Sequence, residues 1–325
     1  MKKFTIIWDM TRRCPFHCLI CCMDASSAEP ETDELDFTAK CKVVDQIRQL
    51  AAKRSIQVDL SGGEIMADLR NLEIAEEISH IIGKDNLGIS TSGYGITEER
   101  AAYLSNIIGE IELTMDTPPG VAYRLRPLEY AQTAAHAVPH LKAYGIHTGI
   151  QTVLTKSNCQ KHNLAALYDW LCNNRIDEWS LLRFYPTGRG ADYPEECLSD
   201  EELLKAVREI QRLDRENPSA AKPSLHFHYT IKGHENYTTE CRCVKKSIGI
   251  LPNGDVTACF WAFDRASHIS EELFRLGNVK TESLSQILES PRARYWQEQP
   301  HICPLISVAK EDRYVSDTEH YDRIA

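Results

Sequence analysis

Between residues 4 and 184, short apolar runs alternate with segments whose apolar residues recur at helical spacing. The strand-like runs are FTIIWD, IQVDL, LGIST, EIELTMD, GIHTGIQTVLT and WSLLRF. Six strand-then-helix units in a row require parallel strands joined by crossover helices. With 325 residues, the chain can form one large α/β domain of the barrel or doubly wound type, together with a small appendage. In such folds the functional side chains gather at the carboxyl ends of the strands.

Capping residues predict where several of the helices begin and end. Thr97 is expected to cap the start of a helix over TEERAAYLSNII, and Gly83 to end the helix that includes NLEIAEEISHII. Another helix, SDEELLKAVREIQRL, carries a capping box formed by Ser199 and Glu202. These signals support the strand-then-helix pattern independently of hydrophobicity.

The last third of the chain has a different pattern. The turn-rich stretch YPTGRGADYP, residues 185–194, marks the exit from the first domain, and NPSAAKPS reads as a linker. IGILPNGDVTACFW alternates around an Asn-Gly turn, which predicts a β-hairpin, and LGNVKTESLSQILESPRARYWQEQ supplies one more helix. We therefore expect a first domain at 1–195, a linking helix and linker at 196–235, and a hairpin-and-helix domain at 236–325.

Composition excludes several classes of function. The formal net charge of −10 argues against a nucleic-acid partner, because binding phosphates needs a concentrated basic surface. No apolar run approaches the length of a membrane span, and the start MKKFTIIWDM has no signal-peptide cleavage site. We therefore expect a cytoplasmic protein with no membrane partner. In that reducing compartment, twelve cysteines are better explained by metal or redox chemistry than by disulfides.

Three of these cysteines, Cys14, Cys18 and Cys21, form a C-x3-C-x2-C loop directly after the first strand-like run. Three thiolates on one tight loop can ligate three irons of a 4Fe-4S cluster and leave the fourth iron without a protein ligand. This loop resembles that of the radical S-adenosylmethionine (radical SAM) superfamily, in which the amino and carboxylate groups of S-adenosylmethionine chelate the open iron. The resemblance implies a partial (β/α)6 TIM-like barrel, with Cys22 as a bystander. A zinc site is the alternative, although structural zinc normally takes four ligands.

A second match, SGGE at 61–64, follows the second strand-like run. In the radical SAM family the glycines of this stretch let the backbone approach the methionine moiety, and a nearby carboxylate or carbonyl takes its ammonium group. By resemblance, these positions are Gly62, Gly63 and Glu64. Alone, the tripeptide is a weak turn signal, but here it stands at the expected strand end after a matching cysteine loop.

Further strand ends are similar to cofactor-binding positions of the family's peptide-modifying and dehydrogenating branch. The segment LTMDTPPGVAYRLRP implies that Thr114 and Arg126, with Arg124 as a rival, hold the carboxylate and ribose of S-adenosylmethionine. Ser92 ends the third strand-like run and Gln151 lies in the fifth, where contacts to ribose and adenine are typical of the family.

The late cysteines form a second group around the expected hairpin. Cys243, Cys259 and Cys303, together with LGNV and SLSQILESPRARYW, resemble the SPASM or shorter twitch extension of radical SAM enzymes, which holds an auxiliary iron-sulfur cluster. The cysteines for a second auxiliary cluster are missing, so the twitch form with one auxiliary 4Fe-4S cluster is the better match. Its fourth ligand is either Cys241 or absent, which would leave an iron open to substrate. A small structural zinc site is the alternative for this region.

The resemblance implies a radical SAM enzyme that takes an electron from a flavodoxin- or ferredoxin-type donor. It would reductively cleave S-adenosylmethionine to a 5'-deoxyadenosyl radical for hydrogen abstraction, and an auxiliary cluster could accept a second electron. We expect an oxidoreductase that crosslinks or oxidises a ribosomally made peptide, because RFYPTGRGA is similar to a segment of many SPASM-type peptide maturases. The first strand begins at Phe4, so a separate protein is expected to recognise a leader peptide.

Two other functions remain open from the sequence. One is a twitch-type radical SAM dehydrogenase that oxidises an alcohol of a carbohydrate or aminocyclitol. The other is a non-enzymatic zinc-binding protein with two metal sites, in which the SGGE stretch has no role. No residue is assigned as a catalytic base.

Overall fold

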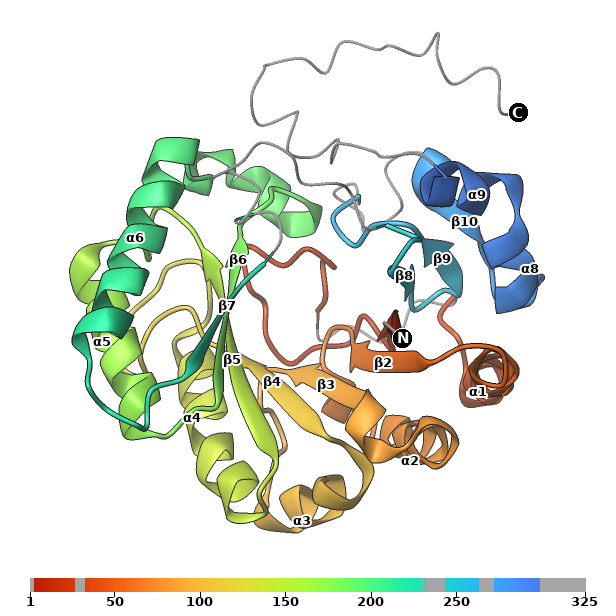
Figure 1. Cartoon of the computed structure of the whole chain (residues 1–325), viewed down its shortest axis with the longest axis horizontal. Helices are drawn as coiled ribbons and strands as arrows, with labels where there is room; N and C mark the ends of the chain where they lie inside the picture. The colour runs from red at the N-terminus through yellow and green to blue at the C-terminus, as the bar shows by residue number, and fades with distance from the viewer. Residues whose placement is uncertain (1–2, 27–32, 229–230, 232–242, 263–271, 299–325) are drawn as a thin grey trace, which may run out of the picture.

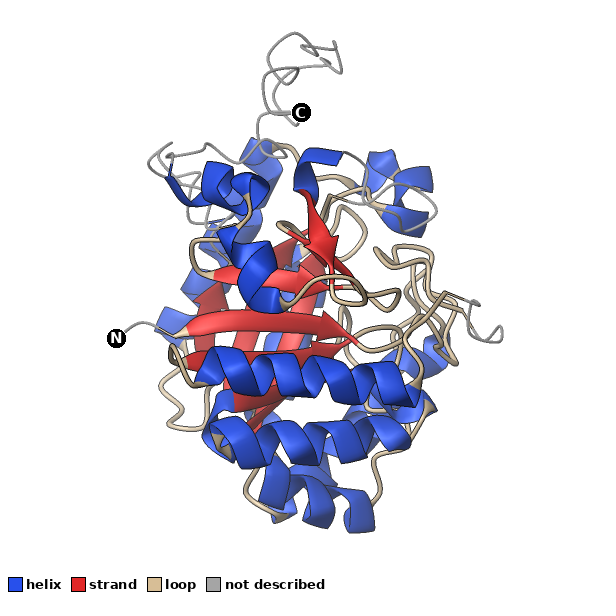
Figure 2. Cartoon of the chain, turned by 90° about the vertical axis from the view of Figure 1, so that its right-hand side faces the viewer, coloured by secondary structure: helices blue, strands red, loops and turns tan. Residues whose placement is uncertain are grey.

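The computed structural model describes residues 3–26, 33–228, 231, 243–262 and 272–298. Their named strands all belong to one ten-stranded sheet. This sheet curves into an open barrel with helices outside it, as Figure 1 and the side view in Figure 2 show. The expected α/β fold with a partial TIM-like barrel is therefore confirmed.

Parallel strands form the barrel wall, and helices between them cover its outer face (Figure 1). The strands are β1 (Phe4–Asp9), β2 (Ile56–Ser61), β3 (Leu87–Thr91), β4 (Glu110–Thr114), β5 (His147–Leu154), β6 (Glu178–Arg183) and β7 (Ser224–Phe227). The helices are α1 (Phe37–Ala51), α2 (Arg70–Ile82), α3 (Glu98–Ile107), α4 (Leu128–Ala143), α5 (Lys161–Asn173) and α6 (Asp200–Glu216). Strand β7 corrects the sequence interpretation, since it lies within the expected linker at 196–235 and pairs in parallel with β6.

Alternation along the strands separates the hydrophobic core from the barrel interior. In β1, Phe4, Ile6 and Trp8 are at most 1% exposed and belong to the main core, which also contains the inner faces of the helices. Ile7 and Asp9 point the other way and line a cavity inside the barrel. The two-residue period of the strand thus places one set of side chains under the helices and the other set around the site.

The predicted helix ends are present. The Thr97 side chain accepts a hydrogen bond from the Arg100 N–H at the start of α3, and Gly83 ends α2 with a φ of 80°. Ser199 and Glu202 form the reciprocal capping box at the start of α6. No helix among the described residues is long and apolar enough to cross a membrane.

The C-terminal hairpin continues the barrel sheet. Strand β8 (Ser247–Ile250) pairs in parallel with β1, and β9 (Asp255–Thr257) returns antiparallel to β8 through the predicted Asn-Gly turn, where Gly254 has a φ of 88°. Strand β10 (Arg275–Asn278) then pairs with β9, so the order of the sheet is β10-β9-β8-β1-β2-β3-β4-β5-β6-β7.

The segment after the hairpin differs from the sequence interpretation. The sequence predicts one helix there, but the segment contains β10 and two short helices, α8 (Leu284–Glu289) and α9 (Pro291–Glu298). The break falls at Pro291, which has no N–H to continue the hydrogen bonding of α8 and instead occupies the first position of α9.

Candidate active site

The cysteine loop, residues 14–26, leaves the carboxyl end of β1 and crosses the mouth of the barrel (Figure 1). The N–H of Cys14 donates to the Ser26 carbonyl at 2.7 Å, and the N–H of Ser26 donates to the Arg12 carbonyl at 3.1 Å. Halfway round the loop, the N–H of Leu19 donates to the Leu125 carbonyl at 2.9 Å. These bonds tie the two ends of the loop together and hold its middle.

The three predicted cluster ligands, Cys14, Cys18 and Cys21, lie in one cluster of contacts with Phe16 and Tyr130. Cys14 and Cys18 are 8% and 5% exposed, and Cys21 is half-buried. Burial raises the pKa of the Cys14 thiol to about 12, and the neighbouring Cys18 and Cys21 thiols add to this shift. Among the described residues, no three Cys, His, Asp or Glu side chains already converge as a metal site. The three thiols are therefore close, but must turn toward a common point to act as ligands.

Arg126 places a positive charge beside these thiols. Burial raises the pKa of the Cys18 thiol, and the Arg126 charge opposes that shift. The Arg126 guanidinium donates to the Asp116 carboxylate and lies 4.7 Å from the centre of the Tyr130 ring. Arg124, the other candidate, is 57% exposed and lies at the surface. Three thiol donors beside a buried cation fit an anionic iron-sulfur cluster.

The glycines of the SGGE stretch dock directly against the start of the cysteine loop. The N–H of Gly63 donates to the Thr11 carbonyl at 2.6 Å, and the N–H of Glu64 donates to the Arg13 carbonyl at 2.8 Å. A Cβ added to Gly63 would lie less than 3.0 Å from the Arg13 carbonyl, and Gly62 has a φ of 135° that side chains rarely adopt. Glycine is thus needed here for contact between two loops of the chain itself, which is a reason that the sequence did not reveal.

Glu64 is held by the neighbouring strand end. It is 1% exposed and accepts hydrogen bonds from the Thr91 hydroxyl at 2.7 Å and from the N–H of Ser92 at 2.9 Å. The Ser92 hydroxyl and the N–H of Met66 also donate to it. Burial raises the pKa of this carboxyl, while the four donors stabilise its ionised form. In this structure the predicted ligands Glu64 and Ser92 bind each other and fix the end of β3 to the end of β2.

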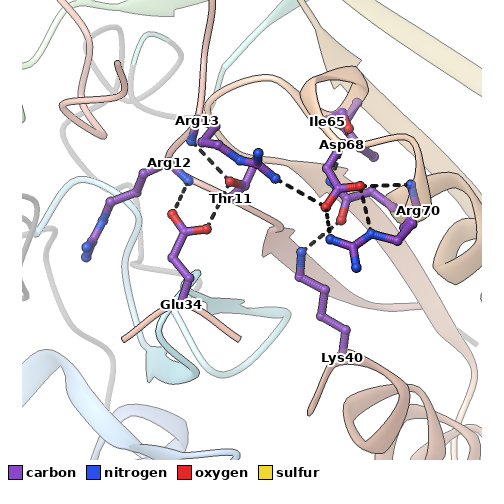
Figure 3. Close-up of polar contacts among 9 residues, drawn as sticks. Thr11, Arg12, Arg13, Glu34, Lys40, Ile65, Asp68 and Arg70 are labelled. Atoms are coloured by element: carbon purple, nitrogen blue, oxygen red, sulfur yellow. Dashed lines mark hydrogen bonds and ion pairs between the residues drawn. The ribbon is translucent and has the colours of Figure 1, made fainter. Parts of the chain in front are cut away.

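A polar network holds the residues that lead into the cysteine loop (Figure 3). The carboxylate of Glu34 accepts from the Arg12 N–H at 2.7 Å and from the Thr11 hydroxyl at 3.0 Å. The guanidinium of Arg13 donates to Asp68, in the turn before α2, at 3.2 Å. These contacts bind the residues just before Cys14 to segments on both sides of β1.

A cavity of about 520 Å³ occupies the barrel interior. Aromatic residues Phe260 and Trp261 line it together with Cys22. Acidic side chains from four strands also line it: Asp9, Asp59, Glu110, Glu112 and Glu178. Asp9 is 3% exposed, and burial raises the pKa of its carboxyl to about 7. The cavity therefore joins an apolar rim with a polar, acidic interior.

Of the remaining residues predicted to contact the cofactor, Gln151 and Gly62 line this cavity, and Thr114 is not among its described lining residues. Gln151 lines the cavity and donates from its side-chain amide to Glu112. Thr114 ends β4 in register with Gln151 and is partly exposed. Gly62 also lines the cavity, and thereby connects the SGGE stretch with its interior.

Two of the late cysteines reach the same cavity. Cys243 and Cys259 are 8% and 6% exposed, and both line it. The Cys259 sulfur accepts a hydrogen bond from the Trp261 N–H at 3.5 Å. Cys241 and Cys303 lie outside the described residues. The structure thus brings Cys243 and Cys259, from the far end of the sequence, to the cavity under the cysteine loop.

One residue that contacts the cysteine loop was not singled out from the sequence. Arg189, in the GRG stretch after β6, donates to the backbone of the loop at several points. The only available signal was the turn-rich composition of residues 185–194, and the resemblance of that stretch to a maturase segment named no role for the arginine.

Two family models match the chain. That of the radical SAM superfamily covers residues 8–160, which include the cysteine loop and the SGGE stretch. The SPASM model, described as an iron-sulfur cluster-binding domain, covers residues 241–307. The chain belongs to the radical SAM superfamily. This radical SAM enzyme accordingly uses S-adenosylmethionine and iron-sulfur clusters as its cofactors.

Curated relatives of this radical SAM enzyme are distant. It is 27% identical over 209 residues to Fe-coproporphyrin III synthase of Methanosarcina barkeri, a match that covers 63% of this chain and 50% of the relative. It is 26% identical over 109 residues to GTP 3',8-cyclase of Haemophilus influenzae, covering 34% and 32%. The chain thus matches half of one curated relative and about a third of the other.

Solved structures share the fold of this radical SAM enzyme. SuiB of Streptococcus suis bound to S-adenosylmethionine has a TM-score of 0.71 at 14% identity, covering 95% of this chain and 75% of SuiB. SuiB bound to its precursor peptide SuiA has a TM-score of 0.71 at 15% identity, covering 92% and 67%. The protein anSMEcpe bound to AdoMet and the Cp18Cys peptide has a TM-score of 0.67 at 14% identity, covering 98% and 95%.

Proposed function

We propose that this radical SAM enzyme oxidatively modifies a ribosomally made peptide, by forming a crosslink or by oxidising a side chain. When bound, the cluster and S-adenosylmethionine supply the 5'-deoxyadenosyl radical that abstracts a hydrogen atom from the substrate. The residues that would hold the cluster are Cys14, Cys18 and Cys21, and Arg126, whose charge acts on the Cys18 thiol, would face S-adenosylmethionine. The observation that carries the choice of substrate is the charge of the cavity.

The cavity favours a substrate that brings hydrogen-bond donors or positive charge. Five carboxyl groups line it together with His147, His226 and His228, and none of its described lining residues is Lys or Arg. Burial raises the pKa of Asp9 and of Asp59 to about 7, so these two carboxyls are partly protonated near neutral pH and the others carry most of the negative charge. A peptide supplies backbone N–H groups and can supply a Lys or Arg side chain, which carboxylates bind well. A polyanion such as GTP or a coproporphyrin would face like charges and a large desolvation cost. The cavity thus argues against transferring the reactions named for the two curated relatives, a synthesis of Fe-coproporphyrin III and a cyclisation of GTP.

Solved relatives supply independent support for a peptide. SuiB and anSMEcpe, which share the fold across nearly all of this chain, have each been solved with a bound peptide. The apolar rim formed by Phe260 and Trp261 would suit the side chains that flank the modified residue.

Cys243 and Cys259 support an overall oxidation. Both line the cavity, so an auxiliary iron-sulfur group held by them, with Cys303 and Cys241 as the further candidate ligands, would lie beside the substrate. Such a group would accept the second electron that leaves the substrate during a two-electron oxidation. A flavodoxin- or ferredoxin-type protein is the proposed electron donor, and a separate protein is proposed to recognise the peptide leader.

The same cavity keeps a second candidate open, namely a dehydrogenase of an aminocyclitol. The amino group of such a substrate would pair with the carboxylates as a basic side chain would. A plain carbohydrate without an amino group would not use this charge.

The test is an anaerobic reaction with S-adenosylmethionine and a reductant. Peptides encoded beside the gene, matched peptides in which Lys and Arg are replaced by Glu, and an aminocyclitol are compared as substrates. The readouts are substrate-dependent 5'-deoxyadenosine and the loss of hydrogen from the substrate by mass spectrometry. We expect both with the basic peptides alone, whereas turnover of the aminocyclitol alone would replace the proposal with the second candidate.

A charge variant makes the test specific for the cavity. Glu112→Gln removes one lining carboxylate, and we expect it to raise KM for a basic peptide by about tenfold, as for loss of a hydrogen bond to a charged group. Glu98→Gln, on the exposed face of α3, is the matched control and should leave KM unchanged. Equal KM values in both variants would contradict binding through the acidic interior.

A further inference from the structure

The segment after β6 holds the cysteine loop through its backbone. The side chain of Arg189 is 11% exposed, and its guanidinium donates to the carbonyls of Cys18 and Ala25 at 2.8 and 2.9 Å. The same guanidinium pairs with Asp24 at 2.6 Å, and the backbone N–H of Arg189 donates to the Cys21 carbonyl at 2.9 Å. Three of these four partners are main-chain carbonyls, so the contacts depend on the path of the loop more than on its side chains.

Gly188 brings the two backbones into direct contact. It has a φ of 54°, and an added Cβ would lie less than 3.0 Å from the carbonyl oxygens of Cys21 and Cys22. Within the loop, Asp24 has a φ of 49°, a left-handed conformation that Asp adopts more readily than most residues other than glycine. The ion pair with Arg189 is one of the contacts that hold Asp24 in this conformation.

The contact crosses the open barrel. Strands β1 and β6, which carry the two segments, are separated in the sheet by β2, β3, β4 and β5. A planar guanidinium with five N–H donors can reach two carbonyls and a carboxylate at once, which a lysine ammonium on a flexible stem does less well. The position therefore favours arginine for its shape as well as for its charge.

We propose that Arg189 is a positioning residue: with Gly188, it fastens the cysteine loop across the barrel mouth, so that the backbone bearing Cys18 and Cys21 keeps its shape before any metal binds. This inference rests on the proposed role of these cysteines as cluster ligands. The fastening itself is a property of the metal-free chain, and it can be tested there without any catalytic turnover.

The test measures how fast each cysteine of the metal-free full-length chain reacts with iodoacetamide, with the sites read by peptide mass spectrometry. In Arg189→Ala we expect Cys18 and Cys21 to be alkylated at least about tenfold faster than in the unmodified chain, because opening of the loop limits access. Tenfold corresponds to about 1.4 kcal/mol of opening free energy. Losing a nearby positive charge would by itself make a thiol less reactive, so a faster reaction reports opening.

Arg183→Ala is the matched control. Arg183 is also a buried arginine of this region, but its side chain donates to the Leu198 carbonyl at 3.0 Å and to Asp200 at 3.1 Å, both outside the cysteine loop. We expect this variant to lose stability without faster alkylation of Cys18 and Cys21. A similar acceleration in both variants would show general loosening and overturn the proposal, as would unchanged rates in Arg189→Ala.

Arg189→Lys covers the case in which the alanine variant fails to fold. Lysine keeps the positive charge but lacks the planar guanidinium with its several N–H donors. We therefore expect alkylation rates of Cys18 and Cys21 between those of the unmodified chain and those of a fully opened loop. Rates equal to those of the unmodified chain would overturn the role of the guanidinium geometry. A second readout is iron lost to a chelator after anaerobic reconstitution, which should be faster in Arg189→Lys than in the unmodified chain. Failure of peptide modification would leave all of these results unaffected.

Discussion

Asp59 shows how single acidic residues behave inside this barrel. It projects from β2 into the cavity, where burial raises the pKa of its carboxyl to about 7 and the nearby Glu110 adds to the shift. Gln57 donates to it at 3.4 Å, and the neighbouring Glu112 also has its pKa raised by burial. The folded chain therefore keeps a proton on Asp59 at pH values where the unfolded chain, with a pKa of 3.8, has released it. Stability due to this group falls as the pH rises from about 4 to about 7, and is constant above that range.

Replacing Asp59 by Asn should remove this pH dependence. We expect the metal-free variant to be more stable than the unmodified chain at pH 8, by an amount of the order of 1 to 3 kcal/mol after allowance for water in the cavity. The advantage should shrink steadily between pH 7 and pH 5, as urea unfolding at each pH would show. Asp45→Asn, at an exposed position of α1, is the control without such a trend. A gain in stability that does not vary with pH would contradict the assignment.

At the scale of elements, the site depends on the junction between the loops that follow β1 and β2. Gly63→Ala would push a methyl group into the Arg13 carbonyl, which belongs to the backbone just before Cys14. We expect it to destabilise the metal-free chain by about 1 to 3 kcal/mol, as overpacking does, and to lower the iron bound after reconstitution. Unfolding in urea and iron analysis provide the two measurements.

Gly149→Ala is the matched control for that change. Gly149 lies in β5, where an added Cβ would meet its nearest atoms at 3.7 Å or more and no unusual φ is required. This variant should keep its stability or gain slightly, because alanine restricts the unfolded chain. If the two variants lose equal stability, then the contact with the cysteine loop is not what requires Gly63.

The elements that could be predicted from the sequence are those with local signals. Thr97 caps the helix that begins at the next residue by accepting from an N–H three residues on, and Gly83 ends a helix through its own φ, so few neighbours decide these outcomes. The spacing of the cysteine loop is local in the same way. Strand β7 could not be predicted because it is four residues long and gains its stability from pairing with β6, 46 residues earlier.

The parts of the site that depend on distant contacts could not be predicted. Arg189 donates to Cys18, which is 171 positions away, and nothing near Arg189 in the sequence reports that partner. SGGE stands at the end of β2, as its place after an apolar run predicts, but its contact with the Arg13 backbone is visible only once both loops are placed. Strand β10 was hidden for a related reason, since it is four residues long and its register against β9 shifts between Arg275 and Gly277.

At the scale of the whole molecule, cysteines from the two ends of the sequence lie near one cavity, which Cys22 of the cysteine loop lines together with Cys243 and Cys259. If they hold separate clusters, changing Cys14, Cys18 and Cys21 together to alanine should leave about four irons of about eight after anaerobic reconstitution. Iron and sulfide analysis, with the unmodified chain as reference, measures this directly. Mutation of Cys41, an exposed cysteine of α1, should leave the count unchanged.

Complete loss of iron in the triple variant would contradict a separate C-terminal cluster. The zinc interpretation of Cys243 and Cys259 would then return, and the proposed oxidation would lose its second electron acceptor. Metal analysis for zinc in the same samples distinguishes these outcomes.

The position of β1 has a consequence for how the protein is made. Its edges are filled by β2 on one side and by β8 on the other, where Thr5 pairs with Ser247. At ribosomal speeds of about 5 to 20 residues per second, roughly ten seconds to a minute separate the synthesis of these two partners. Throughout that interval a nascent chain carries an unpaired strand edge, a known starting point for aggregation. Iron delivered before β8 and β9 have been made would meet a cavity that still lacks one wall, so productive assembly of the holoenzyme has to follow the synthesis of this hairpin.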